Sequence, residues 1–227
     1  NRGCDQCLAA RAGQIAPMTQ SSVAASVDGR DWVLLNASPD LRQQLAATPA
    51  LHPKGLRGSP VKAVVLTNGD VDHIAGLLTL REKTPFTLYA TQATLDVLAA
   101  NSVFAVLDAS LVQKVAIRLD QPFAPLPGLT LTAHAVPGKV PLYLEGEALD
   151  LQMLGEQTIG LTLETASARA EYIPGCADLP PALLARLTRE PVTTRAAAGG
   201  NGMGLLFGHR VMSSLGGALV VSSTPGH

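Results

Sequence analysis

The residues of this sequence best suited to chemistry form a short cluster after an apolar run. Asp70, Asp72 and His73 follow the break at Asn68-Gly69. Carboxylates and imidazole bind divalent metal ions, and they can also move protons. One carboxylate beside one histidine supplies two of the three ligands in the two-histidine, one-carboxylate set of Fe(II) oxygenases. A further histidine from elsewhere in the chain would complete such a site and leave positions open for oxygen and substrate.

A plainer structural interpretation of the same cluster competes with this one. Asp70 or Asp72 can cap the next helix, because a carboxylate there accepts free backbone N–H groups and suits the positive end of the helix dipole. His73 would then be an ordinary surface or core histidine. The pattern Asp-x-Asp-His alone favours this structural interpretation. The flanking sequence is what favours a metal site instead.

The elements around the cluster indicate an active-site position. The apolar, β-branched run 61–67 is typical of a buried strand, and the apolar period over 75–82 predicts a helix. Open α/β sheets bind their ligands at the carboxyl ends of strands. We therefore interpret Asp70, Asp72 and His73 as catalytic residues, and the last two of them as metal ligands.

Three segments resemble the coenzyme PQQ synthesis protein B family, a branch of the metallo-β-lactamase fold involved in making pyrroloquinoline quinone (PQQ). They are Thr19–Ser22 followed by Trp32–Arg42, then Asp70–Glu82, and then Tyr172–Cys176. The resemblance implies an α/β fold of the metallo-β-lactamase-like αββα sandwich type. Residues 191–227 align poorly with the family.

The same resemblance shows which metal ligands are replaced. Metallo-β-lactamase-like hydrolases carry His-x-His-x-Asp-His at this strand end, and Asn68 and Asp70 stand at the first two histidine positions. Lys139 stands where a Pro-Gly-His segment often supplies another ligand, and Cys176 stands in place of a bridging aspartate. The Asp-His pair alone matches, which favours a mononuclear site over an ordinary two-zinc site.

Weaker local matches assign the remaining ligands. Gly208-His209 resembles a later Gly-His segment of the family, so His209 is the expected third ligand of the active-site metal. Cys4 and Cys7 form a Cys-x-x-Cys pair that suits one side of a tetrahedral zinc. The resemblance implies a structural zinc there, although the family's further cysteine just before this point is missing. A redox pair or two ordinary thiols are the alternatives.

Three polar residues are assigned to substrate binding. Asn36 and Ser38 lie at the end of a predicted strand that borders the metal cleft in this fold, although Ser38 or Asp40 can equally cap a helix over 41–47. Lys139 can attract a substrate carboxylate, or it is a solvated loop lysine. Cys176 is interpreted as a buried inert thiol in preference to a metal ligand.

Length and composition limit the classes of protein. The 227 residues, 47% hydrophobic and 15% charged, predict one domain over 1–227 with a well-buried core, and the start at Asn1 predicts a missing N-terminal piece. A formal net charge of −1 without a basic run gives nucleic-acid binding no support. No segment approaches the ~20 apolar residues of a membrane span. Three cysteines without a secreted disulfide pattern make the cytoplasm the default compartment.

The resemblance implies two functions from different classes. The preferred one is an iron-dependent oxygenase that hydroxylates the tyrosine ring of a Glu-Tyr-derived PQQ precursor, with Fe(II) at the active site and dioxygen as co-substrate. The alternative is a non-enzymatic carrier of PQQ or its precursor towards the periplasm, and a residual hydrolase is a third. The oligomeric state stays open, with a homodimer as one alternative.

Overall fold

The computed structural model describes residues 3–55, 58–138, 154–178, 183 and 185. The strands in it are β1 Val23–Ala25, β2 Trp32–Leu35, β3 Val61–Val65, β4 Phe86–Thr91, β5 Val112–Ile117, β6 Pro122–Leu126, β7 Leu129–Ala135, β8 Ile159–Glu164 and β9 Arg169–Tyr172. The α-helices are α1 Asp5–Arg11, α2 Leu41–Ala47, α3 Val71–Ile74 and α4 Gln92–Ala100. The 3-10 helices are η1 Pro49–Leu51, η2 Ala75–Leu80 and η3 Ser102–Val106.

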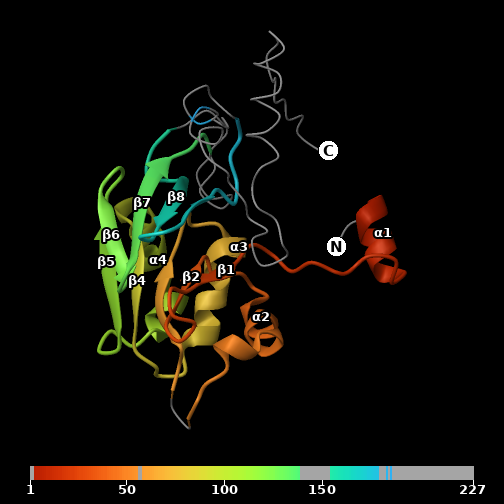
Figure 1. Ribbon diagram of the computed structural model, residues 1–227, viewed down its shortest axis with the longest axis horizontal. Coiled ribbons are helices and arrows are strands. Elements are labelled where there is room, and N and C mark those ends of the chain that lie inside the picture. The colour runs from red at the N-terminus through yellow and green to blue at the C-terminus, as the bar shows by residue number, and fades with distance from the viewer. Residues whose placement is uncertain (1–2, 56–57, 139–153, 179–182, 184, 186–227) are drawn as a thin grey trace.

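Within these residues the strands form two sheets. The first has the order β1-β2-β3-β4-β5 and the second the order β6-β7-β8-β9. Strands β2 to β5 run parallel, and β1 joins them as an antiparallel edge. The second sheet is antiparallel throughout. Figure 1 shows α1 set apart from both sheets and joined to them by an extended segment.

Alternating side chains of the first sheet enter two separate cores. Leu34 and Val64 pack with helical residues such as Leu98, whereas Val33 and Val65 pack against the second sheet. Strands buried on both faces read as continuous apolar runs, which is why 61–66 has little polar interruption. The expected α/β sandwich of the metallo-β-lactamase type is therefore confirmed. None of the described helices is long and apolar enough to cross a membrane.

A helix does begin at Ala75 as predicted, but it is a 3-10 helix that ends at Leu80, not an α-helix over 75–82. The chain forms the short α3 and then this 3-10 helix, η2. Gly76 donates its N–H to the Ala37 carbonyl (2.8 Å) in the loop after β2, so this N–H is not available to continue an α-helix. A Cβ at Gly76 would overlap the Ser38 carbonyl oxygen, so a close backbone approach accompanies this bond.

The predicted helix over 41–47 is confirmed as α2, but its predicted cap is wrong. Asp40 occupies the N-cap position without a side-chain capping bond, and its carboxylate accepts the N–H of Gln20 (2.9 Å). Ser38 Oγ donates to Gln44 Oε1 (3.0 Å). Both side chains therefore join α2 to neighbouring segments, which local helix-capping preferences could not indicate.

Candidate functional site

The Asp-His cluster lies at the carboxyl end of β3, where the two sheets meet. Beyond β3, Asn68 forms an antiparallel bridge with Thr158, and the N–H of Ile159 donates to the Thr67 carbonyl (2.9 Å). Ile159 begins β8, so these contacts join the end of a first-sheet strand to the start of a second-sheet strand. The predicted location at a strand end is therefore correct, and the second sheet contributes to the same region.

Three potential ligands converge in this cluster. Asp70, Asp72 and His73 each offer one ligand atom within 4.8 Å of the others. His73 is 5% exposed, Asp70 is half-buried and Asp72 is exposed, so the group faces outward from a buried imidazole. Carboxylate oxygen with imidazole nitrogen suits divalent iron or zinc, so this donor set fits a divalent metal ion.

Helix capping does not account for the aspartates. Asp70 occupies the N-cap position of α3 without a side-chain capping hydrogen bond, and α3 is only four residues long. Asp72 lies inside the helix and is exposed. The capping hydrogen bond of the competing interpretation is therefore absent from α3, whereas the burial of His73 is compatible with both interpretations.

The surroundings of His73 favour its neutral form. Burial lowers the pKa of His73, and the charges of Asp72 and Asp70 oppose that shift. A neutral imidazole is the form that binds metals, because one ring nitrogen then keeps its lone pair. The pKa direction and the ligand role of His73 are therefore consistent.

The cluster opens into a cavity of about 340 Å³. Its walls come from the ends of β3, β7 and β9 and from the start of β8, and they also include a serine that precedes β1. The lining residues are Ser21, Asn68, Asp70, Asp72, His73, Gly138, Thr158, Pro174, Gly175, Cys176 and Ala177. The volume lies within the range of small-molecule sites, so a substrate can reach the cluster.

The expectation that Cys176 is buried is wrong. Cys176 is exposed on the cavity wall, in the loop after β9. Partial burial of the thiol, followed by the charge of Asp178, raises the pKa of Cys176 and favours the thiol over the thiolate. The three-residue ligand group does not include it. Cys176 therefore lies beside the cluster as part of the cavity wall.

The predicted substrate residues Asn36 and Ser38 are fully buried. Asn36 Oδ1 accepts the backbone N–H of Thr67 (2.9 Å), and Asn36 Nδ2 contacts the Thr67 hydroxyl (2.9 Å) and the Tyr172 hydroxyl (3.3 Å). Asn36 also adopts a positive φ of 64°, a conformation in which asparagine is enriched. Neither residue belongs to the described cavity wall, and their role in binding substrate stays a prediction.

Tyr172 is a residue near the site to which sequence reasoning assigned no role. Its hydroxyl lies 2.9 Å from Ser21 Oγ on the cavity wall. Burial raises the pKa of Tyr172, against a smaller opposing effect of the hydrogen bonds with Ser21 and Asn36. The family-like segment Tyr172–Cys176 includes this tyrosine, but the partners of its hydroxyl are far away in the sequence, so no local pattern indicated them.

The other predicted metal-binding and substrate-binding residues lie away from the Asp-His cluster or outside the described residues. Lys139 and His209 lie outside the described residues. Cys4 precedes α1 and is exposed, and Cys7 lies within α1 and is half-buried. Among the described histidines, cysteines and carboxylates, no third residue joins this pair in a ligand group. The structural zinc therefore stays a prediction.

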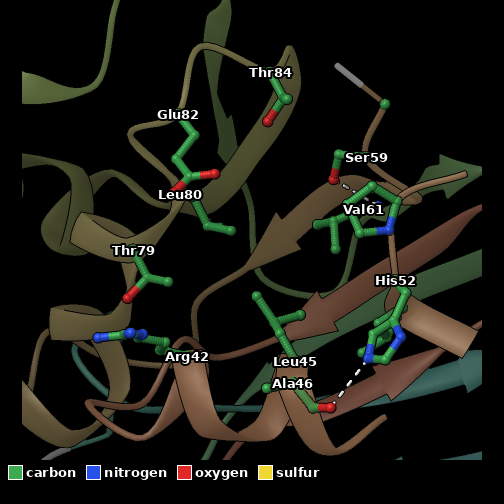
Figure 2. A pocket seen from close by; sticks show the side chains of 13 residues that line it. Arg42, Leu45, Ala46, His52, Ser59, Val61, Thr79, Leu80, Glu82 and Thr84 are labelled. Carbon is green, nitrogen blue, oxygen red and sulfur yellow. Dashed lines mark hydrogen bonds between the residues drawn. The ribbon is translucent and has the colours of Figure 1, made fainter. Parts of the chain in front are cut away.

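A second cavity, of about 280 Å³, lies at the opposite end of β3. Figure 2 shows Val61, the first residue of β3, beside residues of α2 and η2. Arg42 and Glu82 are exposed there, and His52 Nε2 is hydrogen-bonded to the Ala46 carbonyl (3.0 Å). This pocket is separated from the Asp-His cluster by the length of a strand.

Comparison with known proteins agrees with this geometry. The profile of the Beta-lactamase superfamily domain matches residues 31–196, so the chain belongs to the metallo-β-lactamase superfamily. Coenzyme PQQ synthesis protein B of Ruegeria pomeroyi is 53% identical over 188 residues, which cover 83% of this chain and 64% of the relative. The same protein of Methylobacterium sp. (strain 4-46) is 48% identical over 234 residues, covering 96% of this chain and 78% of the relative.

The structural comparison points to the same family. The crystal structure of Zn²⁺-bound PqqB from Methylobacterium extorquens superposes with a TM-score of 0.81 at 50% identity, covering 85% of this chain and 66% of that one. The chain belongs to the coenzyme PQQ synthesis protein B family. It spans 64% of the length of the Ruegeria relative.

Proposed function

We propose that this chain acts in PQQ biosynthesis as a non-haem iron-dependent oxygenase that hydroxylates the tyrosine ring of a Glu-Tyr-derived precursor. The observation that carries the proposal is the ligand cluster of Asp70, Asp72 and His73 at the mouth of a substrate-sized cavity. Membership of the PQQ synthesis family supports the pathway. The donor set supports one divalent metal, because Asn68 and Asp70 replace the two histidines that would serve another.

The ligands proposed for Fe(II) are Asp72, His73 and His209, and the bound ion would supply the activation of dioxygen that ring hydroxylation requires. Asp70 is proposed as a further ligand or as a group that holds a proton beside the substrate. His73 serves as a neutral ligand, since its pKa is lowered by burial. The zinc in the Methylobacterium extorquens relative agrees with a divalent metal in this family.

The cavity wall gives the substrate proposal its details. Gly138 lines the cavity, and Lys139 follows it directly in the chain. We propose that Lys139 attracts a carboxylate of the precursor, because a protonated ammonium cannot bind the metal. Asn36 is proposed to support substrate binding through the Tyr172 hydroxyl, which contacts Ser21 on the wall.

The alternative of a non-enzymatic carrier rests on a separate observation. The cavity is open to solvent and large enough for a small bound molecule without any metal chemistry. A carrier would bind PQQ or its precursor there and release it unchanged. The cytoplasmic location, the homodimer and the structural zinc at Cys4 and Cys7 also remain proposals.

Turnover measurements separate these functions. We would measure metal content and oxygen-dependent conversion of a tyrosine-containing precursor in wild type, Asp72→Ala and His73→Ala. Each variant is expected to lose metal and at least 10²-fold of the turnover rate, because each removes a direct ligand. Asp96→Ala is the matched control, since Asp96 is an exposed carboxylate on α4 that pairs with Gln92 away from the cluster.

Each alternative predicts a different pattern of results. Full oxygenation by both ligand variants would contradict the oxygenase proposal. Tight binding of PQQ without oxidation by any form of the protein would favour the carrier. Metal-dependent hydrolysis of esters or lactams would favour a hydrolase of the kind common in the superfamily.

A further inference from the structure

Asn68 makes contacts that the loss of a metal-binding histidine does not explain. Its side-chain Oδ1 accepts the backbone N–H of Asp70 (3.0 Å) and lies 2.5 Å from His73 Nδ1. Asn68 is 5% exposed, so both contacts are shielded from water. One oxygen atom thus contacts two of the three residues in the ligand cluster.

The Asp70 N–H fixes the orientation of the Asn68 amide. A backbone N–H can only donate, so the Asn68 atom that it meets is the carbonyl oxygen and not the amide nitrogen. That oxygen offers only lone pairs to His73. The hydrogen of a neutral His73 ring is therefore on Nδ1, and Nε2 keeps the lone pair.

Asn68 itself is held firmly from both sheets. Its backbone pairs with Thr158 in an antiparallel bridge. The preceding residue, Thr67, accepts from the Ile159 N–H (2.9 Å) and donates its own N–H to Asn36 Oδ1 (2.9 Å). A side chain on a backbone constrained on both sides has little freedom to turn away from its partners.

We infer that Asn68 is a positioning residue that sets the tautomer and ring orientation of His73, so that Nε2 is the atom offered to the metal. The first position of the His-x-His-x-Asp-His pattern therefore holds a residue that does not bind the metal in this chain. Asn68 instead orients His73, which does. This inference deepens the proposed function, and the part that concerns metal affinity rests on that proposal. Removal of such supporting groups typically weakens metal binding about 10–100-fold.

The tautomer can be measured without any metal. We would label the histidine side chains of the full chain with ¹⁵N, remove metal by chelation and record the imidazole nitrogen shifts at a pH where His73 is neutral. Wild type is expected to carry its hydrogen on Nδ1. Asn68→Ala removes the acceptor and is expected to move His73 towards the Nε2–H form, which predominates in water. Asn68→Asp keeps an acceptor oxygen and is expected to keep Nδ1–H.

Spectra of His73→Ala assign the signals of this ring. A wild-type ring with its hydrogen on Nε2 would overturn the inference, and so would an unchanged tautomer in Asn68→Ala. Where Asn68→Ala does not fold, Asn68→Gln makes the same comparison, because its amide is displaced by one methylene group.

Cobalt binding gives a second readout that a purely structural role would not move. We would titrate Co²⁺ into each variant and follow its visible absorption bands and binding heat. Asn68→Ala is expected to bind Co²⁺ about 10–100-fold more weakly than wild type, and Asn68→Asp close to wild type. Asn101→Ala is the matched control, because Asn101 Nδ2 donates to the Val97 carbonyl (2.7 Å) at the end of α4. It is expected to bind as wild type does.

Failure of this inference and failure of the proposed metal site give different results. If Asn68→Ala keeps wild-type affinity and band shape while His73→Ala loses affinity, the positioning role is wrong and the metal site stands. If His73→Ala binds Co²⁺ as tightly as wild type, the metal site is wrong. The tautomer measurement then decides the role of Asn68 by itself.

Discussion

At the scale of single residues, buried polar side chains connect the cavity wall to the strand ends. The Tyr172 hydroxyl lies 2.9 Å from Ser21 Oγ and accepts from Asn36 Nδ2 (3.3 Å). Asn36 in turn bonds to the backbone and hydroxyl of Thr67, which precedes Asn68. A tyrosine from the second sheet therefore stabilises both the wall and the segment that leads to the ligand cluster.

Because of Tyr172, the free energy of unfolding is expected to fall at alkaline pH. Burial raises the pKa of Tyr172 above its ordinary value of about 10. The folded state therefore holds this proton more tightly than the unfolded state. The contribution of Tyr172 to the free energy of unfolding is fully present and independent of pH below the unfolded pKa, and it is lost as pH rises from there through the folded pKa.

We predict that Tyr172→Phe weakens this alkaline loss of stability. At neutral pH the substitution is expected to lower the free energy of unfolding by about 1 kcal/mol, because the hydroxyl leaves its hydrogen bonds with Ser21 and Asn36. Denaturant unfolding between neutral pH and pH about 11 would measure both effects. An equally steep alkaline loss in wild type and variant would show that Tyr172 is not the cause.

At the scale of elements, the segment after β3 is shaped by its contact with the loop after β2. The Ala37 N–H donates to the His73 carbonyl (2.7 Å), and the Gly76 N–H donates to the Ala37 carbonyl (2.8 Å). These two bonds connect α3 and η2 to the same loop residue. The backbone at His73 is thus held in place by the loop after the neighbouring parallel strand β2. It does not belong to a long helix.

A methyl group at Gly76 is therefore expected to disrupt this contact. A Cβ there would overlap the Ser38 carbonyl and lie 2.8 Å from the Ala37 carbonyl carbon, and both neighbours are backbone atoms. We predict that Gly76→Ala lowers the free energy of unfolding by about 1–3 kcal/mol, as overpacking does elsewhere.

The control for this prediction is Gly55→Ala, since nothing lies within 4 Å of the added Cβ. It is expected to change stability by no more than about 0.5 kcal/mol. Chemical denaturation of the three proteins would make the comparison. Equal stability of Gly76→Ala and wild type would mean that the loop can move away at little energetic cost.

At the scale of the whole molecule, the first sheet is shared by two apolar cores. One core contains residues of helices α2, α3 and α4, and the other contains the facing side chains of the second sheet. The Asp-His cluster follows a strand of the first sheet, while Thr158 and Cys176 reach the cavity from the second. The geometry of the site therefore depends on how the two sheets pack.

The core between the sheets is expected to control global stability. Leu131 is 0% exposed in it, whereas Leu8 on α1 is 52% exposed. We predict that Leu131→Ala lowers the free energy of unfolding by about 2–5 kcal/mol, because it leaves a cavity in packed surroundings. Leu8→Ala, the same chemical change, is expected to have an effect within about 0.5 kcal/mol. Similar losses in the two variants, measured by urea unfolding, would contradict this.

The sequence by itself determined the features that depend on neighbouring residues. The β-branched run of β3 and the extent of α2 were predictable, because strand and helix periods act locally. The closeness of Asp72 and His73 was predictable for the same reason, since both residues follow one strand end. The resemblance to a known family added the αββα arrangement.

Only the tertiary structure decided which partners meet across long sequence separations. Even over the five residues from Asn68 to His73, the contact with His73 Nδ1 depends on the turn that joins β3 to α3. The contact of Tyr172 with Asn36, the bond between Asp40 and Gln20 and the exposure of Cys176 could not be predicted. Side-chain periodicity fixes which face a residue occupies, but the packing of two sheets fixes what it touches there.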